Sequence, residues 1–557
     1  MKNHFVHLLW FLCALLVFSS CSQSSKSRKL LEQIPDQADV VVLADVKKIF
    51  SSAGGTVEDG RITLPDYITD RLSGKESRKL DEALDFLRDS GIDLDLCAVT
   101  VTDYEKASPI IIVVLDDKKK FVNAIQDEDF DETDDEDGLK FYSKRTYESS
   151  YNSDYDEYCY IAVGDKYAFI MPDVSGRGDS KPVKMISRLV GDAAQASFAS
   201  TAYAEYIIGD DSALGIAFRM PRELRRELRQ AGVPEELADM YKGTFCARTK
   251  LSDDAATMRF RFLGEDGKPV DFSSLKGSID FDARVSNKAL SYLHSDEFIV
   301  GAMAVKGVDW GAITDAIGSQ PGMPATYRIG MGVVRNYLEN IDGTVAFGFG
   351  LTDGLRSVAR LDYGVDVMKQ MAFTLVVETK SGRAVTMVSD LASFVEQTGI
   401  PVQRGSGDGF SISIPQASGD IYVEADDDIL VISNRPVSSV NTNEAVKAFP
   451  FTDYISAGVV ELPSDNPLME QLGIDADVQL SGISIMPDFE SELRLEITGG
   501  NVTGGILARL ANILVTISES NDSYNRLRRE VREAKYGADD DYDTDTVAVD
   551  TVVAYAE

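Results

Sequence analysis

The fold of this chain is decided by a stretch that occurs twice. Residues 40–50 read VVVLADVKKIF, and residues 299–310 read IVGAMAVKGVDW. In each copy an apolar run with the length of a buried strand leads through a Val-Lys pair into a turn. The elements that follow recur in the same order, which predicts two tandem homologous units rather than a short-period solenoid.

The matching elements after this stretch are helices, single strands and a hairpin. The paired segments are 80–87 with 333–338, 97–101 with 344–349, 110–115 with 373–378, 118–125 with 389–397, 160–171 with 421–432, 213–218 with 456–461, and 257–262 with 492–497. An α+β chain without a duplication also contains short strands of this kind. Two halves that do not superpose would therefore contradict the prediction.

Alternating polarity sets the fold class. Residues 257–262 (TMRFRF) and 410–414 (FSISI) alternate apolar and polar side chains, as strands with one buried face do. Hairpins join neighbouring strands in antiparallel order. The sequence therefore predicts an α+β fold of antiparallel sheets with helices on one face, built as two tandem homologous units.

The predicted organisation has five parts. They are a signal peptide (1–20), a polar tether (21–33), a first α+β unit (34–290), a second unit that ends in a helix (291–535), and an acidic tail (536–557). The charge of the tail predicts disorder. Two units also suit the length, because single cores stop growing near ~250 to 300 residues.

The composition excludes two broad classes of protein. The 557 residues include 91 Asp and Glu against 56 Lys and Arg, a formal charge of −35, and 44% are hydrophobic. This apolar content excludes a disordered chain, and the acidic excess disfavours nucleic acid, whose phosphates require concentrated Lys and Arg. Nine acids lie among the eleven residues 127–137, which we interpret as a solvated loop inserted in the first unit.

The N-terminus resembles a bacterial export signal. Lys2 supplies a positive start, residues 5–18 are mostly apolar, and small residues precede Cys21. The apolar run is shorter than the ~20 residues that a membrane-spanning helix needs. Residues 18–21 (FSSC) resemble the lipobox of bacterial lipoproteins, with Phe18 in place of the usual Leu.

The lipobox resemblance implies a lipid anchor. It implies cleavage before Cys21 and acylation of its thiol and new amino group, so that acyl chains hold the protein on a membrane. An ordinary secretory signal with a chance cysteine is the alternative. Residues 22–29 are polar and basic and carry no acidic export cluster. We therefore expect a lipid anchor in the outer membrane, with the protein facing the periplasm.

A further resemblance covers the first fifty residues. Cys21 is followed by a short polar stretch, then by residues 34–36 (IPD) and 38–46 (ADVVVLADV). This opening is similar to that of a family of Bacteroidetes envelope lipoproteins known only as a domain of unknown function. The resemblance implies an envelope location and an α+β fold, and it carries over no catalytic residues.

A basic helix face is a candidate lipid contact. After Pro221, spacings of three and four residues place four arginines on one face of a helix, where they suit anionic headgroups. They are Arg222, Arg225, Arg226 and Arg229. Interleaved Glu223 and Glu227 support the alternative that this face only balances the acidic chain.

Three Asp-Ser/Thr-aliphatic triplets suggest modification. They resemble the O-glycosylation sites of exported Bacteroidetes proteins, and they place candidate sites at Ser212, Thr546 and Thr551. The last two lie in the acidic tail, where access is easy. A three-residue pattern also arises by chance.

Catalytic chemistry has few residues to use. Once residues 1–20 are removed, His294 is the only histidine, so Ser-His-Asp, Cys-His and zinc sites all depend on it. The motifs of zinc proteases, α/β-hydrolases and P-loops do not occur. Cys97, Cys159 and Cys246 lie in apolar, strand-like stretches and are expected to be buried free thiols. We predict no enzyme, no cofactor and no metal.

The sequence favours a binding protein. We predict a non-catalytic, membrane-anchored lipoprotein of the bacterial cell envelope that binds or scaffolds another envelope component. Its expected partners are the membrane, through acylated Cys21, and an unidentified envelope protein or ligand. The alternative is an envelope hydrolase with paired carboxylates. Two facing buried acids in a pocket would favour the hydrolase, and a broad apolar groove between the units would favour binding.

Overall fold

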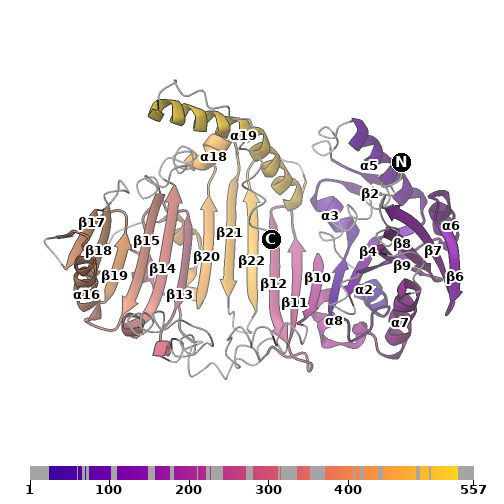
Figure 1. The fold of residues 1–557 in the computed structure, drawn as a ribbon, viewed down its shortest axis with the longest axis horizontal. Coiled ribbons are helices and arrows are strands. Elements are labelled where there is room, and N and C mark those ends of the chain that lie inside the picture. Colours follow the sequence, from indigo (N-terminus) through magenta and orange to yellow (C-terminus); the bar gives the residue numbers. More distant parts are fainter. Residues whose placement is uncertain are drawn as a thin grey trace.

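The computed structural model describes residues 24–536 with internal gaps. The gaps are 59–60, 66–68, 70–73, 102–108, 148–156, 176–180, 210, 221–225, 227–242, 271–279, 281, 312–313, 315–334, 352–370, 406–407, 414–419, 437–442, 485–489 and 501–503. Sheet runs through the described part of the molecule from one end to the other (Figure 1).

Twenty strands of the described residues form one antiparallel sheet, which we divide into two halves of ten. Side by side in the first half lie β6 (Asp131–Glu136), β7 (Leu139–Tyr147), β8 (Glu157–Val163), β9 (Tyr167–Ser175), β5 (Ile110–Leu115), β4 (Ile92–Val101), β1 (Val40–Ala44), β10 (Leu214–Arg219), β11 (Thr244–Leu251) and β12 (Ala255–Leu263). The small hairpin of β2 (Thr56–Glu58) and β3 (Arg61–Thr63) is separate.

The second half shows the same arrangement. Its strands lie in the order β16 (Val402–Arg404), β17 (Gly409–Ser413), β18 (Asp420–Asp426), β19 (Ile429–Ser433), β15 (Met371–Thr379), β14 (Ile341–Leu351), β13 (Ile299–Ala304), β20 (Ser456–Leu462), β21 (Asp477–Ser484) and β22 (Ser491–Thr498). The predicted mixture of helices with large antiparallel sheets is thus confirmed.

The halves meet where β12 pairs with β22. Arg259 lies opposite Glu492 in this pairing, and the Arg259 Nε donates to the Glu492 carboxylate at 2.7 Å. Outward from that pair, the strands succeed one another in matching order toward β6 at one end and β16 at the other. The sheet is therefore continuous across the junction.

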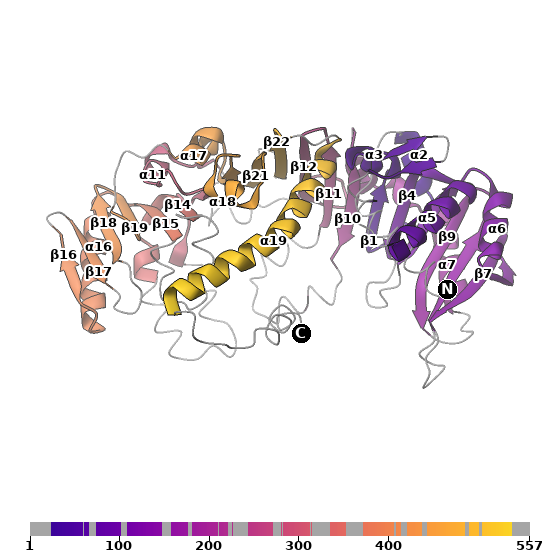
Figure 2. The same cartoon turned by 90° about the horizontal axis from the view of Figure 1, so that it is seen from above.

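Successive side chains of a strand point to opposite faces of the sheet. We call front the face that carries Phe260, Leu493 and Phe347, and back the face that carries Arg259 and Ala302. Figure 2 shows α11 and α17 on one side of the sheet and α19 on the other.

Helices pack on both faces, which corrects the prediction of one covered face. On the back lie α2 (Ser24–Leu31), α7 (Lys181–Gln195), α8 (Ala202–Ile208), α11 (Asn287–Leu290) and α17 (Glu444–Ala448), with the short turns η2 (Phe198–Ser200) and η5 (Phe451–Asp453). On the front lie α3 (Val46–Ser52), α5 (Gly74–Asp89), α6 (Lys118–Asp127), α16 (Arg383–Gln397), α18 (Pro467–Leu472) and α19 (Ile506–Tyr536). The cause is visible in β5 (IIIVVL), whose consecutive apolar residues require cover on both sides.

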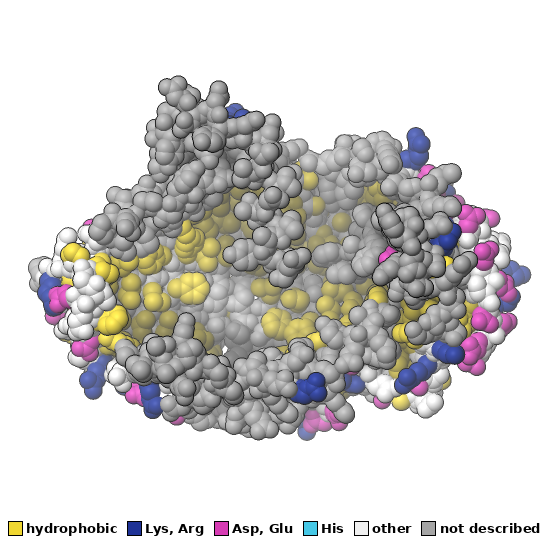
Figure 3. Space-filling model, in the orientation of Figure 1, with side chains coloured by type: hydrophobic (Ala, Val, Ile, Leu, Met, Phe, Trp, Pro, Cys, Tyr) yellow, Lys and Arg dark blue, Asp and Glu magenta, His cyan; other side chains and the backbone are white. Residues whose placement is uncertain are grey.

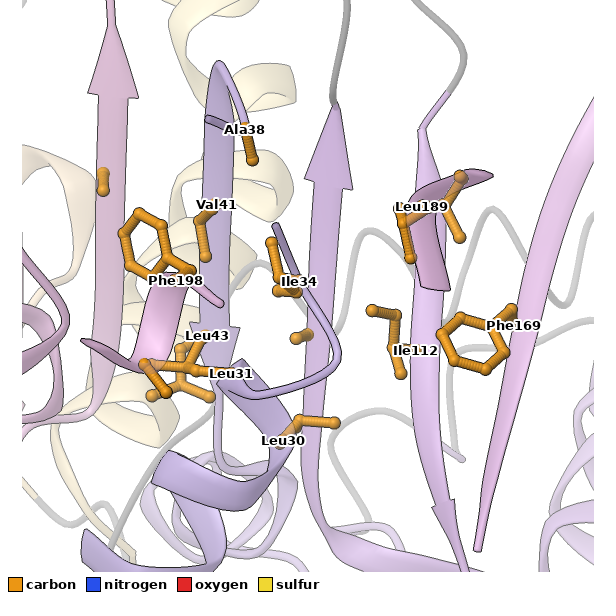
Figure 4. Packing of buried hydrophobic residues seen from close by; sticks show 14 of the residues in the cluster. Leu30, Leu31, Ile34, Ala38, Val41, Leu43, Ile112, Phe169, Leu189 and Phe198 are labelled. Atoms are coloured by element: carbon orange, nitrogen blue, oxygen red, sulfur yellow. The ribbon is translucent and has the colours of Figure 1, made fainter. Parts of the chain in front are cut away.

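The predicted polar tether is largely a packed helix. In α2, Leu30 and Leu31 are 0% exposed, as is Ile34 after the helix. Leu31 points toward Leu43 of β1 and Phe198 (Figure 4). The polar residues of SSKSRKLL lead into this apolar end, so composition alone concealed the burial. Only two residues, 22 and 23, separate Cys21 from α2.

The predicted acidic loop is instead part of a hairpin. α6 continues to Asp127, and β6 is an outermost strand whose six side chains are all exposed. Asp137 and Gly138 form the turn in left-handed backbone, with φ of 55° and 78°. An edge strand offers unpaired N–H and C=O groups to other chains, and a row of acids opposes that pairing. The acids therefore protect one edge of the sheet.

Candidate functional site

The strands at the junction carry opposite chemistry on their two faces. On β11, β12, β22 and β21 the back-face residues are rich in charge and include Arg248, Arg259, Arg261, Glu492, Arg494 and Glu496. The front-face residues of the same strands include Phe245, Met258, Phe260, Phe262, Leu480, Leu493 and Leu495. An amphipathic sheet normally turns its apolar side to a cover. The front face is therefore the apolar face of these strands.

The front face is apolar well beyond the junction. The strands β10, β11, β12, β22, β21, β20, β13 and β14 lie side by side in this order. In their paired segments the described front-face side chains carry no charge, and the polar ones are Thr249, Ser456, Ser484 and Ser491. Met303 is 46% exposed, Phe347 50%, Leu480 38% and Leu493 40%. Figure 3 shows apolar side chains along the floor of a hollow on this side. A partly exposed apolar surface of this kind is a candidate binding site. We call it the apolar floor.

Three glycines lie in register across the apolar floor. Gly301 pairs with Gly458, and Gly458 pairs with Gly482 on the next strand. A Cβ at Gly301 would collide with the ring of Phe347, which lies over it. A Cβ at Gly458 would come no closer than 3.7 Å to Val300 O, and one at Gly482 no closer than 3.6 Å to Leu493. Packing within the described chain therefore does not require glycine at these two positions.

Glycine inside a strand is costly unless something approaches closely. It costs about 0.5–1 kcal/mol relative to Ala, and it often marks the place where a ligand lies on the backbone. The positions of matching register in the first half are Val42, Ile216 and Ala247. The second half alone therefore has a flat strip of backbone, bordered by Phe347 and Leu493.

Aromatic side chains border the apolar floor in the first half. The Phe245 ring lies 5.7 Å from that of Phe260 and 5.6 Å from that of Phe262, measured between ring centroids. Such tilted and edge contacts are favourable by about 0.5–1.5 kcal/mol a pair. The three rings therefore form one aromatic cluster at this border.

Helix α19 covers one end of the apolar floor. Its first turns pack Ile506, Leu507 and Leu510 against front-face residues that include Leu251 and Leu495. Further along, Leu514 is 58% and Ile517 39% exposed. The first turns of α19 thus pack against the sheet, whereas the apolar side chains of Leu514 and Ile517 further along are exposed.

The back face at the junction is closed by its own charges. The Tyr206 hydroxyl donates to Glu490 at 2.6 Å, and the guanidinium groups of Arg248 and Arg261 lie 4.8 and 4.5 Å from the Tyr206 ring centroid. Burial, followed by this hydrogen bond, raises the pKa of Tyr206. Arg248 also lies 3.6 Å from the Glu490 carboxylate, whereas the Arg261 Nε is buried without a hydrogen-bond partner among the described residues. Glu490 is thus paired within the chain, by Tyr206 and Arg248.

A second unusual feature is the buried acid Glu297. Its side chain is 1% exposed, and burial raises its pKa to about 7. Nearby His294 has a pKa lowered by burial. Sequence reasoning singled out His294 but not Glu297, because one acid among 91 carries no local signal.

The sites predicted from sequence are not brought together. Arg226 has helical backbone and an exposed side chain. The structure does not describe the other three arginines, Arg222, Arg225 and Arg229. Cys21, Thr546 and Thr551 also lie outside the described residues. Ser212 is 7% exposed, and its hydroxyl donates to Leu214 O at 3.3 Å. In the folded chain Ser212 is thus shielded from a modifying enzyme, and glycosylation there stays a prediction.

The expectation of buried free thiols is confirmed. Cys97, Cys159 and Cys246 are buried and unbonded to one another. Burial raises the pKa of the Cys246 thiol to about 12. Because the thiolate is the reactive form, Cys246 is chemically inert at neutral pH.

The described acids give no specific support to the hydrolase alternative. The buried Asp45 caps α3, Asp93 accepts from Lys26 at 3.1 Å, and Glu490 accepts from Tyr206. Within the described residues, no cluster of three or more His, Cys, Asp and Glu side chains is placed to hold a metal ion. Within the same part of the chain, no helix is long and apolar enough to cross a membrane.

Comparison with known proteins adds no relative. No family model matches the chain, and no curated protein or solved structure is significantly similar to it. The arguments for function therefore rest on the apolar floor and on the sequence.

Proposed function

We propose that the protein is a lipid-anchored component of the bacterial cell envelope that holds the acyl chain of a membrane lipid on its apolar floor. The observation that carries this proposal is the partly exposed front face, uncharged in its described residues from β10 to β14. Burying apolar surface is favourable by about 25 cal/mol per Å². An acyl chain gains this free energy when it binds, and it brings no polar group that needs a hydrogen-bond partner.

A peptide is a poorer occupant of the same surface. The strands of the floor, such as β13, β20 and β21, are already paired on both sides, so none offers a free edge for strand addition. A peptide lying across them would leave its backbone N–H and C=O groups unpaired against apolar side chains, which is costly. The strip over Gly458 and Gly482 accepts a thin, unbranched chain at close range.

The ligand experiment uses the soluble Cys21→Ala variant. We expect purified protein to yield acyl lipids on solvent extraction, and the delipidated protein to bind a fluorescent fatty acid saturably, with displacement by unlabelled fatty acid. Lipid-free protein without saturable binding would contradict the proposal. Preferential saturable binding of an apolar peptide would overturn the choice of occupant.

We also propose that Cys21 carries the anchor and that the protein lies in the outer membrane facing the periplasm. The lipobox resemblance supports the anchor. Because α2 starts at Ser24, the linker of residues 22 and 23 reaches only about 10 Å. The body would then rest close to the headgroups, next to the source of its ligand.

The anchor has a direct test. Replacing Cys21 by Ala is expected to move the protein from the membrane fraction to the soluble fraction, because the acylated residue is lost while the folded body is unchanged. Fractionation followed by immunoblotting measures this, with Cys97→Ala as the control that stays membrane-bound. Continued sedimentation of the Cys21→Ala variant with membranes would refute the anchor.

The two halves are proposed to be homologous units created by duplication. The matching strand order supports this. So does the register: Val40 pairs with Val101 and Phe218, and Ile299 pairs with Phe349 and Val460 on the corresponding strands. In this proposal the first unit starts at α2 and the second at α11, since each helix precedes the first strand of its half.

A further inference from the structure

Glu297 lies on the back of the second half, two residues before β13. Its carboxyl group rests on Gly348 of β14, where a Cβ would collide with it. Thr374 of β15, which pairs with Gly348, interacts with the same carboxyl group. The acid is thus held in a narrow space between its own segment and the sheet.

The hydrogen bonds around Glu297 leave one of its oxygens without a donor. The backbone N–H of His294 donates to Oε2 at 2.9 Å, and Oε1 is buried without a hydrogen-bond partner among the described residues. An ionised carboxylate accepts about four hydrogen bonds when it is satisfied. A buried carboxylate with one oxygen left unpaired is therefore disfavoured.

The neighbouring hydroxyls only partly satisfy the carboxyl group of Glu297. Thr374 forms a side-chain hydrogen bond with it, which lowers the pKa of Glu297 by less than burial raises it. The Thr374 hydroxyl also lies 3.2 Å from the Ser433 hydroxyl, where either oxygen can donate, and Ser433 donates to the Phe373 carbonyl at 3.0 Å. None of these hydroxyls pairs with Oε1 within the described residues. A proton on the carboxyl group would remove the unsatisfied charge.

Few charged groups of the described residues lie around Glu297. On its own segment lie His294 and Asp296, and Arg435, just after β19, forms an ion pair with Asp296. From β14 and β15 only the uncharged Gly348 and Thr374 face it, and Asn443 before α17 donates to Glu297 O at 2.8 Å. Burial raises the pKa of Glu297 and is the largest effect; the hydrogen bonds of Thr374 and of the His294 N–H lower it, and the charges of Asp296 and Arg435 raise and lower it by less.

The first half has an apolar residue at the matching place. Ala38, two residues before β1, is 3% exposed, and Ile110 lies where the second half has Thr374. A buried acid is therefore not needed to form this kind of core. Its presence in the second half indicates a role of its own.

We propose that Glu297 is a proton-operated latch, neutral when closed, that holds residues 283–297 against the back of the second half. This segment contributes Val285, Leu290 and Leu293 to the core there. When Glu297 loses its proton, an unsatisfied negative charge lies between residues 283–297 and the sheet, and this segment opens. The proposal is independent of lipid binding.

The direction of the pH dependence follows from the direction in which folding shifts the pKa of Glu297. The pKa of Glu297 is raised from 4.5 to about 7 in the folded protein. The closed state therefore binds the proton more tightly than the open state. Its stabilisation is complete below pH 4.5 and is lost as the pH rises through about 7.

The test is hydrogen exchange of the peptide covering residues 285–297, corrected for the intrinsic pH dependence of exchange. Between pH 5 and pH 8 we expect the opening equilibrium of the wild-type segment to increase by about 10- to 100-fold. Glu297→Gln keeps the shape and is neutral at every pH; its amide can donate toward Thr374. This variant is expected to stay closed at pH 8.

Two controls make the outcome decisive. A peptide from the first half, covering residues 28–40, is expected to show no such change, because Ala38 replaces the acid there. Isotope-edited infrared spectra should show a protonated carboxyl band at pH 5 that fades by pH 8 and is absent from Glu297→Gln. Equal pH dependence in the wild type and in Glu297→Gln, or absence of that band at pH 5, would overturn the latch.

Discussion

Replacing Gly458 by Val is expected to stabilise the protein and, at the same time, to weaken its binding of an acyl chain by at least about tenfold. The added Cβ has room among the described residues, where its nearest neighbour would be Val300 O at 3.7 Å. A β-branched residue suits a strand better than glycine, by about 0.5–1 kcal/mol. The same side chain stands on the strip where the ligand is proposed to lie.

Calorimetry and titration with the fluorescent fatty acid measure the two effects separately. Gly191→Ala is the control, because Gly191 lies in α7 and no described residue comes within 4 Å of the added Cβ. It should stabilise the protein without changing binding. Gly301→Val should instead destabilise it, because Phe347 occupies the space. Unchanged affinity in a correctly folded Gly458→Val variant would rule out the strip as the acyl site.

Replacing Leu31 by Ala is expected to lower the free energy of unfolding by about 2–5 kcal/mol. Leu31 is 0% exposed in the core that joins α2 to β1, so the truncation removes buried contacts and leaves a cavity. Denaturant unfolding of the soluble Cys21→Ala background measures the loss. A polar, loosely attached tether would give almost no change.

The control for this truncation is Leu480→Ala on the apolar floor. Leu480 is 38% exposed, so its replacement should cost much less stability while reducing acyl-chain binding. A loss at Leu31 no larger than that at Leu480 would show that α2 is not part of the cooperative core.

The positions of strands along the chain could be predicted from the sequence, whereas the pairing of each strand with its neighbours in the sheet could not. The alternation in residues 257–262 predicts the two faces of β12, and the apolar run of residues 40–44 predicts a buried β1. Nothing local to β12 indicates that β22 lies beside it, because that pairing joins residues far apart in the chain. The apolar floor depends on such pairings, and for this reason it was not predicted.

The wrong predictions have a common physical cause. Composition predicted a solvated loop at residues 127–137 and a polar tether at residues 21–33, yet β6 is held by backbone pairing to β7, and α2 by two leucines at its end. The backbone hydrogen bonds of a strand can form even when its side chains are acidic. The burial of one or two leucines can hold a helix against the core even when most of its other residues are polar. Glu297 was missed because the residues against its carboxyl group include Gly348 and Thr374, which are distant in the sequence.

The Arg259–Glu492 pair affects how separate copies of the chain meet. If β12 of one molecule met β12 of another in a register centred on residue 259, two arginines would stand opposite each other; two β22 strands would oppose two glutamates in the same way. Like charges directly across a strand pair repel, whereas within one molecule the opposite charges attract. A single complementary pair thus discourages strand exchange between chains and favours closure of each chain on itself.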